Sequence, residues 1–164
     1  MRTLVMVGAG QAAAVAARTL RRRGFDGRIE LIGEEFELPY QRPPLSKEYL
    51  DTGDDEGLVL LTEDWCAKND VRLRLGCGVA QIDPGAAAVE LLDASRVQAD
   101  AVLIATGSTP RRLVGVGGDR ICYLRTRRDA DLLRERLLPG ARLIVIGAGF
   151  IGSEVAATAL VKGL

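Results

Sequence analysis

The chain has 164 residues, 48% of them hydrophobic and 27% charged, which is enough for one domain core or slightly more. Its 22 basic and 22 acidic residues cancel, and aromatic residues make up only 4%. Neither a nucleic-acid-binding surface nor a base-stacking surface is therefore indicated. The chain contains no histidine, which excludes histidine-based triads, metal sites and general bases.

The three cysteines, Cys66, Cys77 and Cys122, are odd in number and widely spaced. They fit neither a disulfide framework nor a C-x-x-C redox or zinc motif. We therefore expect a reducing compartment and a small, buried or half-buried apolar role for each thiol.

The N-terminus loosely imitates a secretory signal, because Arg2 precedes an apolar run and an alanine-rich stretch. Gly8, Gly10 and Gln11 interrupt the apolar run, and three arginines follow at 21–23. No stretch approaches the ~20 apolar residues that a membrane span needs. The prediction is a cytoplasmic protein.

In chain order, the first elements form a β-α-β unit. Residues 3–7 are a short apolar run that ends at glycine, which is typical of a strand buried on both faces. Residues 11–23 are rich in alanine and end in arginines before Gly24, as helices commonly do. Residues 28–33 supply a second strand, predicted to be parallel and adjacent to the first.

The remaining elements alternate between sheet and helix. The expected order is a helical turn at 46–50, an acidic loop at 51–57, a helix at 62–69 with Thr62 as N-cap, a strand at 71–75, hairpin strands at 79–83 and 88–92, a strand at 101–105, a crossing segment at 111–124, a helix at 129–138, a strand at 142–146 and a helix from Phe150 onward.

The first glycine turn matches the G-x-G-x-x-G/A pattern between a strand and a helix. Gly8 permits the tight turn, Gly10 allows backbone N–H groups to approach a pyrophosphate, and the small Ala13 lets helix and strand pack closely. Glu34 follows the second strand, where a carboxylate can accept hydrogen bonds from ribose hydroxyls. A plain turn in an α/β protein is the alternative interpretation.

The second glycine turn has glycine at all three positions, Gly147, Gly149 and Gly152, and follows the predicted strand 142–146. Glu154 comes on the first turn of the next helix. No second strand or acidic residue follows within the sequence, so we expect this nucleotide site to be incomplete. A plain turn is again the alternative.

Four segments together resemble a known family. They are the stretch from Gly33 to Lys47 that contains PYQRPPLSK, VLIATGSTP at 102–110, YLRTRRDADLL at 123–133 and VIGAGFIGSEVAATA at 145–159. Residues 3–160 resemble the pyridine-nucleotide-disulfide-oxidoreductase-like flavoproteins, in the branch of the putidaredoxin and rhodocoxin reductases. PYxRPPLSK is highly specific to this branch.

The resemblance implies FAD on the first Rossmann unit, NAD(P)H on the second and a [2Fe–2S] ferredoxin as electron acceptor. The expected fold is α/β: an FAD-binding domain with a parallel sheet and a β-meander, followed by the first β-α of a second, NAD-binding Rossmann domain. We expect an incomplete FAD-binding domain at 1–110, a crossover at 111–140 and the start of the NAD(P)-binding domain at 141–164. Members of the family are much longer, so the resemblance implies a truncated chain with exposed apolar faces that favour self-association.

The resemblance also assigns roles to individual residues. Expected FAD contacts are Gly8, Gly10, Ala12, Ala13, Glu34, Arg42, Lys47, Val79, Ala105, Thr106, Gly107 and Arg125. Gly147, Gly149 and Gly152 are expected to face the nicotinamide nucleotide.

Lys47 and Glu154 match a lysine–glutamate pair that lies beside the flavin ring in the family, so an ion pair is predicted and both residues are expected to be catalytic. An ammonium near a flavin stabilises its reduced form. A solvated surface lysine is the alternative for Lys47. Tyr40 and Trp65 are more simply packing residues.

Three functional interpretations remain open: part of an FAD-dependent NAD(P)H:ferredoxin reductase, a nucleotide-binding module without turnover, or an unrelated protein that uses Rossmann turns structurally. NADH and NADPH are not distinguished, because the discriminating residue would follow a strand that the sequence does not contain.

Overall fold

The computed structural model describes residues 2–115 and 117–164, so Val116 of the predicted crossing segment lies outside the described residues. The chain divides into two compact units, each described here by itself. The first unit comprises Met1–Gln41 and Val59–Gly107, and the second comprises Arg42–Leu58 and Ser108–Leu164. The PPLSK motif therefore groups with the C-terminal part of the chain, although the predicted FAD-binding domain at 1–110 contained it.

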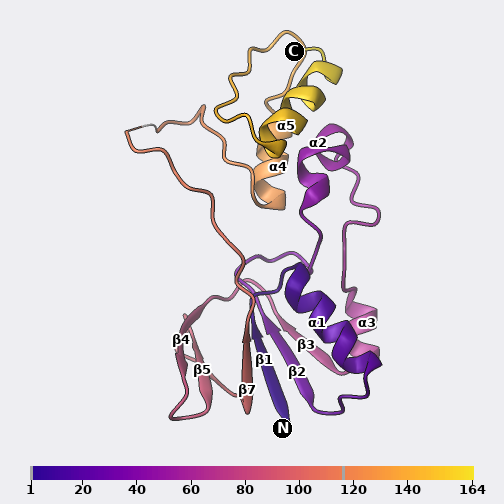
Figure 1. The fold of residues 1–164 in the computed structure, drawn as a ribbon, viewed down its shortest axis with the longest axis vertical. Coiled ribbons are helices and arrows are strands. Elements are labelled where there is room, and N and C mark those ends of the chain that lie inside the picture. Colours follow the sequence, from indigo (N-terminus) through magenta and orange to yellow (C-terminus); the bar gives the residue numbers. More distant parts are fainter. Residues whose placement is uncertain (1, 116) are drawn as a thin grey trace. The chain divides into compact units, whose positions relative to one another are not determined.

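A parallel sheet with the order β3-β2-β1-β7 organises the described part of the first unit (Figure 1). The strands are β1 (Thr3–Val7), β2 (Arg28–Ile32), β3 (Val71–Arg74) and β7 (Ala101–Ile104), and each neighbouring pair is parallel. The helices are α1 (Gln11–Arg22) and α3 (Glu63–Lys68). The predicted α/β class and its first β-α-β unit are confirmed.

A second sheet in this unit is an antiparallel meander of β4 (Val79–Asp83), β5 (Ala88–Leu91) and β6 (Arg96–Gln98). The predicted hairpin is present. The β-meander that the family resemblance implied is confirmed. The position of its third strand, β6, was not predicted, because a three-residue segment is too short to show an alternating pattern.

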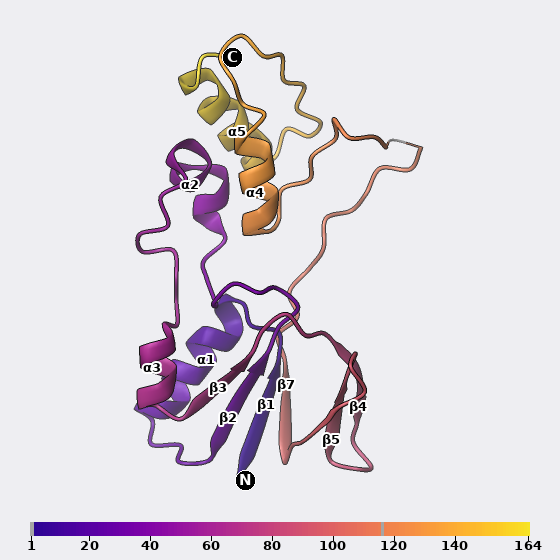
Figure 2. The same ribbon diagram turned by 180° about the vertical axis from the view of Figure 1, so that it is seen from behind.

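The two faces of the parallel sheet belong to different cores. Leu4 and Met6 of β1 pack toward α1 and α3, whereas Val5 and Val7 pack toward the meander. Side chains of a strand alternate between faces, so one apolar run fills both cores. Figure 2, the view from behind, shows α1 on one side of the parallel sheet and strands β4 and β5 of the meander on the other.

Small side chains bring α1 close to the sheet. Ala13, Ala14 and Ala17 are buried in the core that contains Met6, which is fully buried. Burial of a methionine side chain is worth about 2 kcal/mol. The alanines thus hold the helix against β1, with its N-terminus directed at the glycine turn.

The second unit is helical in its described part. It contains a 3-10 turn η1 (Pro43–Ser46) and the helices α2 (Glu48–Thr52), α4 (Arg127–Arg134) and α5 (Phe150–Val161). Leucines and small apolar residues join the helices in one core: Leu50, Leu133, Leu137, Val155 and Ala159. The predicted turn at 46–50 is thus two short elements. Proline at the first positions of η1 presets its backbone.

The predicted strand at 142–146 is wrong. Residues 141–148 have no regular secondary structure, and Ile144 and Ile146 are 86% and 71% exposed. A strand requires a partner for its backbone groups. No segment in the described part of the second unit provides one, since the paired strands all belong to the first unit.

A polar cluster ties α2 to α4. The hydroxyl of buried Tyr49 donates to Asp131 Oδ1 at 2.7 Å and accepts from Arg127 Nε at 2.8 Å. The guanidiniums of Arg127 and Arg134 lie 5.4 and 5.6 Å from the centre of the Tyr49 ring. Arg127 also pairs with Asp55 at 2.9 Å. Desolvation and the bond to Asp131 raise the pKa of Tyr49 above its ordinary value.

We expect Tyr49 to ionise at higher pH than an exposed tyrosine. Because its pKa is raised in the folded state, its contribution to stability is complete below the unfolded-state pKa of about 10 and is lost as pH rises through the folded value. Ultraviolet titration at 295 nm of the wild type and of Tyr49→Phe measures the difference. The difference between the two titration curves gives the pKa of Tyr49. If that pKa equals the ordinary value of an exposed tyrosine, the assignment is wrong.

None of the helices within residues 2–115 and 117–164 combines the length and the hydropathy that a membrane span requires.

Candidate cofactor-binding site

The first glycine turn has a backbone that only glycine adopts without strain at its first position. Gly8 has φ +108°, and a methyl carbon added there would lie 2.2 Å from the carbonyl oxygen of Ala105. The Gly8 N–H donates to the Ile32 carbonyl at 2.8 Å, and the Ala105 N–H donates to Val7 at 2.7 Å. The turn therefore contacts the carboxyl ends of both β2 and β7, with no room for a side chain at Gly8.

Open space adjoins the second glycine of this turn. Gly10 is the N-cap of α1, with φ −89° and ψ −168°, and a methyl carbon added there would meet no atom within 4 Å. No side chain caps the helix, and its first turn has no acidic residue. Backbone N–H groups and the positive end of the helix dipole thus face a space that an anionic phosphate can fill.

The other predicted FAD residues of this unit follow the carboxyl ends of β2 and β7. Glu34 is exposed, and a methyl carbon added at Gly78, next to Val79, would lie 3.1 Å from the Glu34 carboxylate. Ala105, Thr106 and Gly107 follow β7 directly. Glu34 and residues 105–107 thus lie at the sheet edge where open α/β sheets bind ligands. Ala13 does not face this edge, because it is fully buried and packs α1 against the sheet. The predicted FAD residues in this unit are Gly8, Gly10, Ala12, Ala13, Glu34, Val79, Ala105, Thr106 and Gly107.

The second glycine turn repeats the backbone of the first. Gly147 has φ +113°, against +108° at Gly8, and Gly149 has φ −81° and ψ 177°, close to the values at Gly10. A methyl carbon added at Gly152 would lie 2.4 Å from the Gly147 carbonyl oxygen, so the helix requires its third glycine. Two segments 139 positions apart, from Gly8 to Gly147, thus form the same turn.

Arg42, the residue before PPLSK, contacts a second residue predicted to bind FAD. The Arg42 guanidinium donates to the carbonyl oxygen of Arg125 at 2.7 Å. Both residues belong to the second unit and are half-buried. Their predicted contact with FAD stays a prediction.

The predicted Lys47–Glu154 ion pair is present, with Lys47 Nζ 3.3 Å from Glu154 Oε1. The Lys47 and Glu154 side chains are 44% and 28% exposed, so solvent screens the attraction between their charges. A hydrogen bond from Ser46 and the charge of Lys47 hold the pKa of Glu154 below its ordinary value. The arrangement fixes a cation rather than stabilising the fold.

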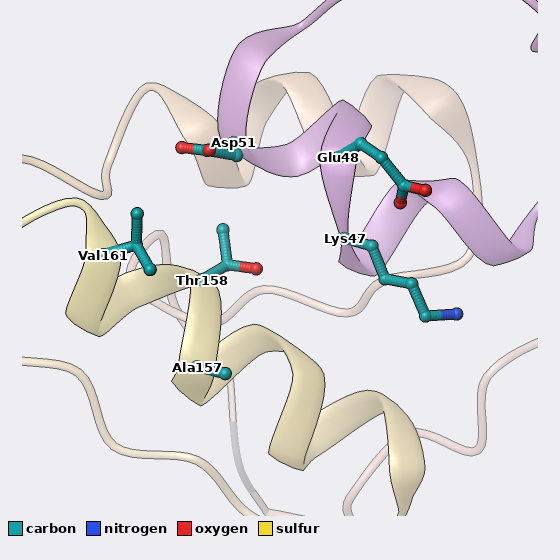
Figure 3. A pocket seen from close by; sticks show the side chains of 6 residues that line it. All are labelled: Lys47, Glu48, Asp51, Ala157, Thr158 and Val161. Carbon is teal, nitrogen blue, oxygen red and sulfur yellow. The ribbon is translucent and has the colours of Figure 1, made fainter.

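A small cavity of about 210 Å³ lies between α2 and α5, beside this pair (Figure 3). Thr158 and Val161 of α5 face α2, while the Lys47 side chain extends away from them. The ammonium is therefore directed out of this cavity rather than into it.

Sequence reasoning missed two features of the molecule. Ser46 hydrogen-bonds Glu154, although its position beside Lys47 in PPLSK was a usable signal. Glu30 is fully buried, and its signal was an acidic residue inside the apolar strand RIELI. The expectation for the thiols is confirmed at Cys66, which is buried, and at half-buried Cys77, and is wrong at exposed Cys122.

Two glycine turns of one geometry, each opening a helix, are typical of the class of proteins that bind dinucleotides. The family model of the pyridine nucleotide-disulphide oxidoreductases matches residues 2–163, and the chain belongs to this family. Membership implies FAD and a nicotinamide nucleotide as cofactors, and both glycine turns fit a pyrophosphate.

Ferredoxin reductases are among the most similar proteins. Rhodocoxin reductase of Rhodococcus erythropolis is 45% identical over 167 residues, which cover 99% of this chain and 39% of the relative. A ferredoxin–NAD(+) reductase component of a 3-phenylpropionate/cinnamic acid dioxygenase from Photorhabdus laumondii is 41% identical over 163 residues, 98% of this chain and 41% of the relative.

The fold matches a solved structure of the same kind. The covalent putidaredoxin reductase–putidaredoxin complex superimposes with a TM-score of 0.92 at 36% identity, covering 99% of this chain and 40% of that chain. This chain therefore spans about two fifths of the length of the relatives that it matches.

Proposed function

We propose that the chain is part of an FAD-dependent oxidoreductase that takes a hydride from NAD(P)H and passes electrons to a [2Fe–2S] ferredoxin of an oxygenase system. The observation that carries the proposal is the pair of glycine turns with matching backbone torsions. A second line of support is the set of relatives named as ferredoxin–NAD(+) reductases.

Bound FAD would accept two electrons as a hydride and release them one at a time, which no side chain of this protein can do. The residues of the chain supply binding and electrostatics. The backbone at Gly8, Gly10 and the start of α1 would hold the pyrophosphate, and Glu34 would accept from the ribose hydroxyls. The second glycine turn, at Gly147, Gly149 and Gly152, would hold the pyrophosphate of the nicotinamide nucleotide.

Lys47 would act as a fixed positive charge toward the flavin. The hydride brings negative charge, which an ammonium stabilises. Glu154 keeps the ammonium in one direction through the 3.3 Å contact. Arg42 and Arg125, joined by a 2.7 Å hydrogen bond, would add further positive charge.

A second candidate function is a nucleotide-binding module without turnover. The segment 142–146 favours it, because this segment has no strand partner among the described residues of its unit. A nicotinamide nucleotide held only by the following turn would be poorly positioned for hydride transfer.

Anaerobic reduction separates the two functions. The purified chain, saturated with FAD, is mixed with NADH or NADPH while absorbance near 450 nm is followed. Bleaching, followed by reduction of an added [2Fe–2S] ferredoxin, is the result expected for the reductase. Flavin binding without bleaching would assign the chain to the module, and absence of flavin binding would overturn both.

A further inference from the structure

The carboxylate of Glu154 is held at both of its oxygens. Ser46 Oγ donates to Oε2 at 2.5 Å, and Lys47 Nζ lies 3.3 Å from Oε1. Ser46 is 5% exposed, whereas the Lys47 side chain is 44% exposed. The shorter contact to the glutamate therefore comes from the buried hydroxyl and not from the lysine.

Ser46 is also held through its backbone. Thr158 Oγ1, on the turn of α5 that follows Glu154, donates to the Ser46 carbonyl oxygen at 3.3 Å. The same helix thus contacts the backbone and the side chain of Ser46. Pro43 and Pro44, whose rings fix their own φ, begin the 3-10 turn η1 that carries Ser46.

The hydroxyl of Ser46 has one proton and two acceptors within reach. Glu154 Oε2 lies at 2.5 Å and the Pro43 carbonyl oxygen at 3.5 Å. An ionised carboxylate accepts only, so it orders the hydroxyl proton toward itself. A protonated Glu154 can instead donate to Ser46, whose proton is then free to turn to Pro43.

We propose that Ser46 is a positioning residue, which fixes the Glu154 carboxylate by one oxygen so that the other oxygen holds the Lys47 ammonium in a single direction. The inference rests on the proposed function, in which that ammonium acts on the flavin. A lysine with four rotatable methylenes gains direction only from what it contacts. Lys47 contacts Glu154 and, at 3.4 Å, the Pro43 carbonyl oxygen.

The charged groups around this carboxylate are few among the described residues. Lys47 faces it from the junction of η1 and α2. Glu48 and Asp51 lie on α2, where Asp51 is contacted by Lys162 of α5 at 3.8 Å. The hydrogen bond from Ser46 lowers the pKa of Glu154 most, and the hydrogen bond and charge of Lys47 lower it further. The contribution of the ionised Glu154 carboxylate to stability is therefore complete above the unfolded-state pKa of about 4.3. This contribution is lost as pH falls through the lower pKa of the folded state.

The test is a carboxyl titration of the whole chain without cofactor, by ¹³C NMR of labelled glutamate, with Glu154→Gln identifying the Glu154 signal. Ser46→Ala is expected to raise the pKa of Glu154. Thr158→Val, which removes the other α5 contact to Ser46, serves as the matched control. It is expected to lower thermal stability while leaving this pKa unchanged.

An unchanged pKa in Ser46→Ala would overturn the proposal. A second variant keeps it testable should Ser46→Ala not fold. In Lys47→Met the pKa of Glu154 is expected to stay below that of an ordinary glutamate, because Ser46 still donates to it. A return to the ordinary value in Lys47→Met would show that Ser46 contributes nothing.

The readout does not require flavin, so the proposed function is tested separately. With FAD bound, the midpoint potential of the flavin should fall in Ser46→Ala, since the cation no longer has a fixed direction. A shifted carboxyl titration without any flavin binding would leave the positioning contact in place and reject the proposed function.

Discussion

Replacing Gly8 by alanine is expected to destabilise the first unit and to abolish FAD binding. The added methyl carbon would lie 2.2 Å from the Ala105 carbonyl oxygen, in a backbone with φ +108°. A strained φ alone costs about 1–3 kcal/mol, and the steric conflict with β7 adds to it. We expect the free energy of unfolding to fall by about 3 kcal/mol or more.

Urea unfolding measures this loss through the fluorescence of Trp65, the one tryptophan of the chain, which lies in α3 of the same unit. Gly10→Ala is the matched control, because Gly10 has an ordinary φ of −89° and open space around it. Its stability is expected to change by less than about 1 kcal/mol. Equal unfolding midpoints for Gly8→Ala and the wild type would refute the strain argument.

Glu30→Gln is expected to cause the second large loss of stability. The Glu30 carboxylate is fully buried and contacts Arg28 Nη2 at 2.5 Å as well as Arg74 Nε. The Arg28 and Arg74 side chains are 42% and 37% exposed, so water solvates the arginine charges that remain. The expected cost is therefore about 2 kcal/mol, from the weakened charge-assisted hydrogen bonds of the buried Glu30 side chain. Arg28 Nε is already buried without a hydrogen bond among the described residues, so the substitution weakens a guanidinium that has one unsatisfied nitrogen.

The matched control is Glu90→Gln. Glu90 pairs with Arg96 at 2.9 Å, but these side chains are 35% and 58% exposed, so the expected loss is below about 1 kcal/mol. Both substitutions remove one charge from a strand, and they differ in burial. Urea unfolding again measures the free energy of unfolding. If Glu30→Gln loses no more of it than Glu90→Gln, the buried carboxylate does not stabilise the unit more than the exposed one.

Local patterns predicted most of the first unit. Three predictions with short-range physical causes are confirmed. They are the strand from the apolar run 3–7, the end of α1 at its arginines before Gly24, and the start of α3 at its N-cap Thr62. The segment 142–146 shows the limit of this reasoning. Its apolar run is as continuous as that of β1, yet a strand forms only where another strand accepts its hydrogen bonds.

The candidate site was predictable to the same degree. The torsions of Gly8 and Gly147 follow from the glycine spacing, and the Lys47–Glu154 pair followed from the family resemblance. Ser46 was missed because a serine in a proline-rich stretch has many ordinary local roles. Its bond to Glu154 spans 108 positions, so only the packing of α5 against η1 reveals it.

Titration of the chain with FAD, for the wild type and for Gly10→Ala, tests the central claim most directly. Quenching of flavin fluorescence reports binding, and urea unfolding confirms that both proteins are folded. If the first glycine turn holds the pyrophosphate, the wild type binds FAD saturably and Gly10→Ala binds at least about tenfold more weakly, a loss of ~1.4 kcal/mol. Equal affinity of the two folded proteins for FAD would contradict the assignment of this turn as the cofactor cradle.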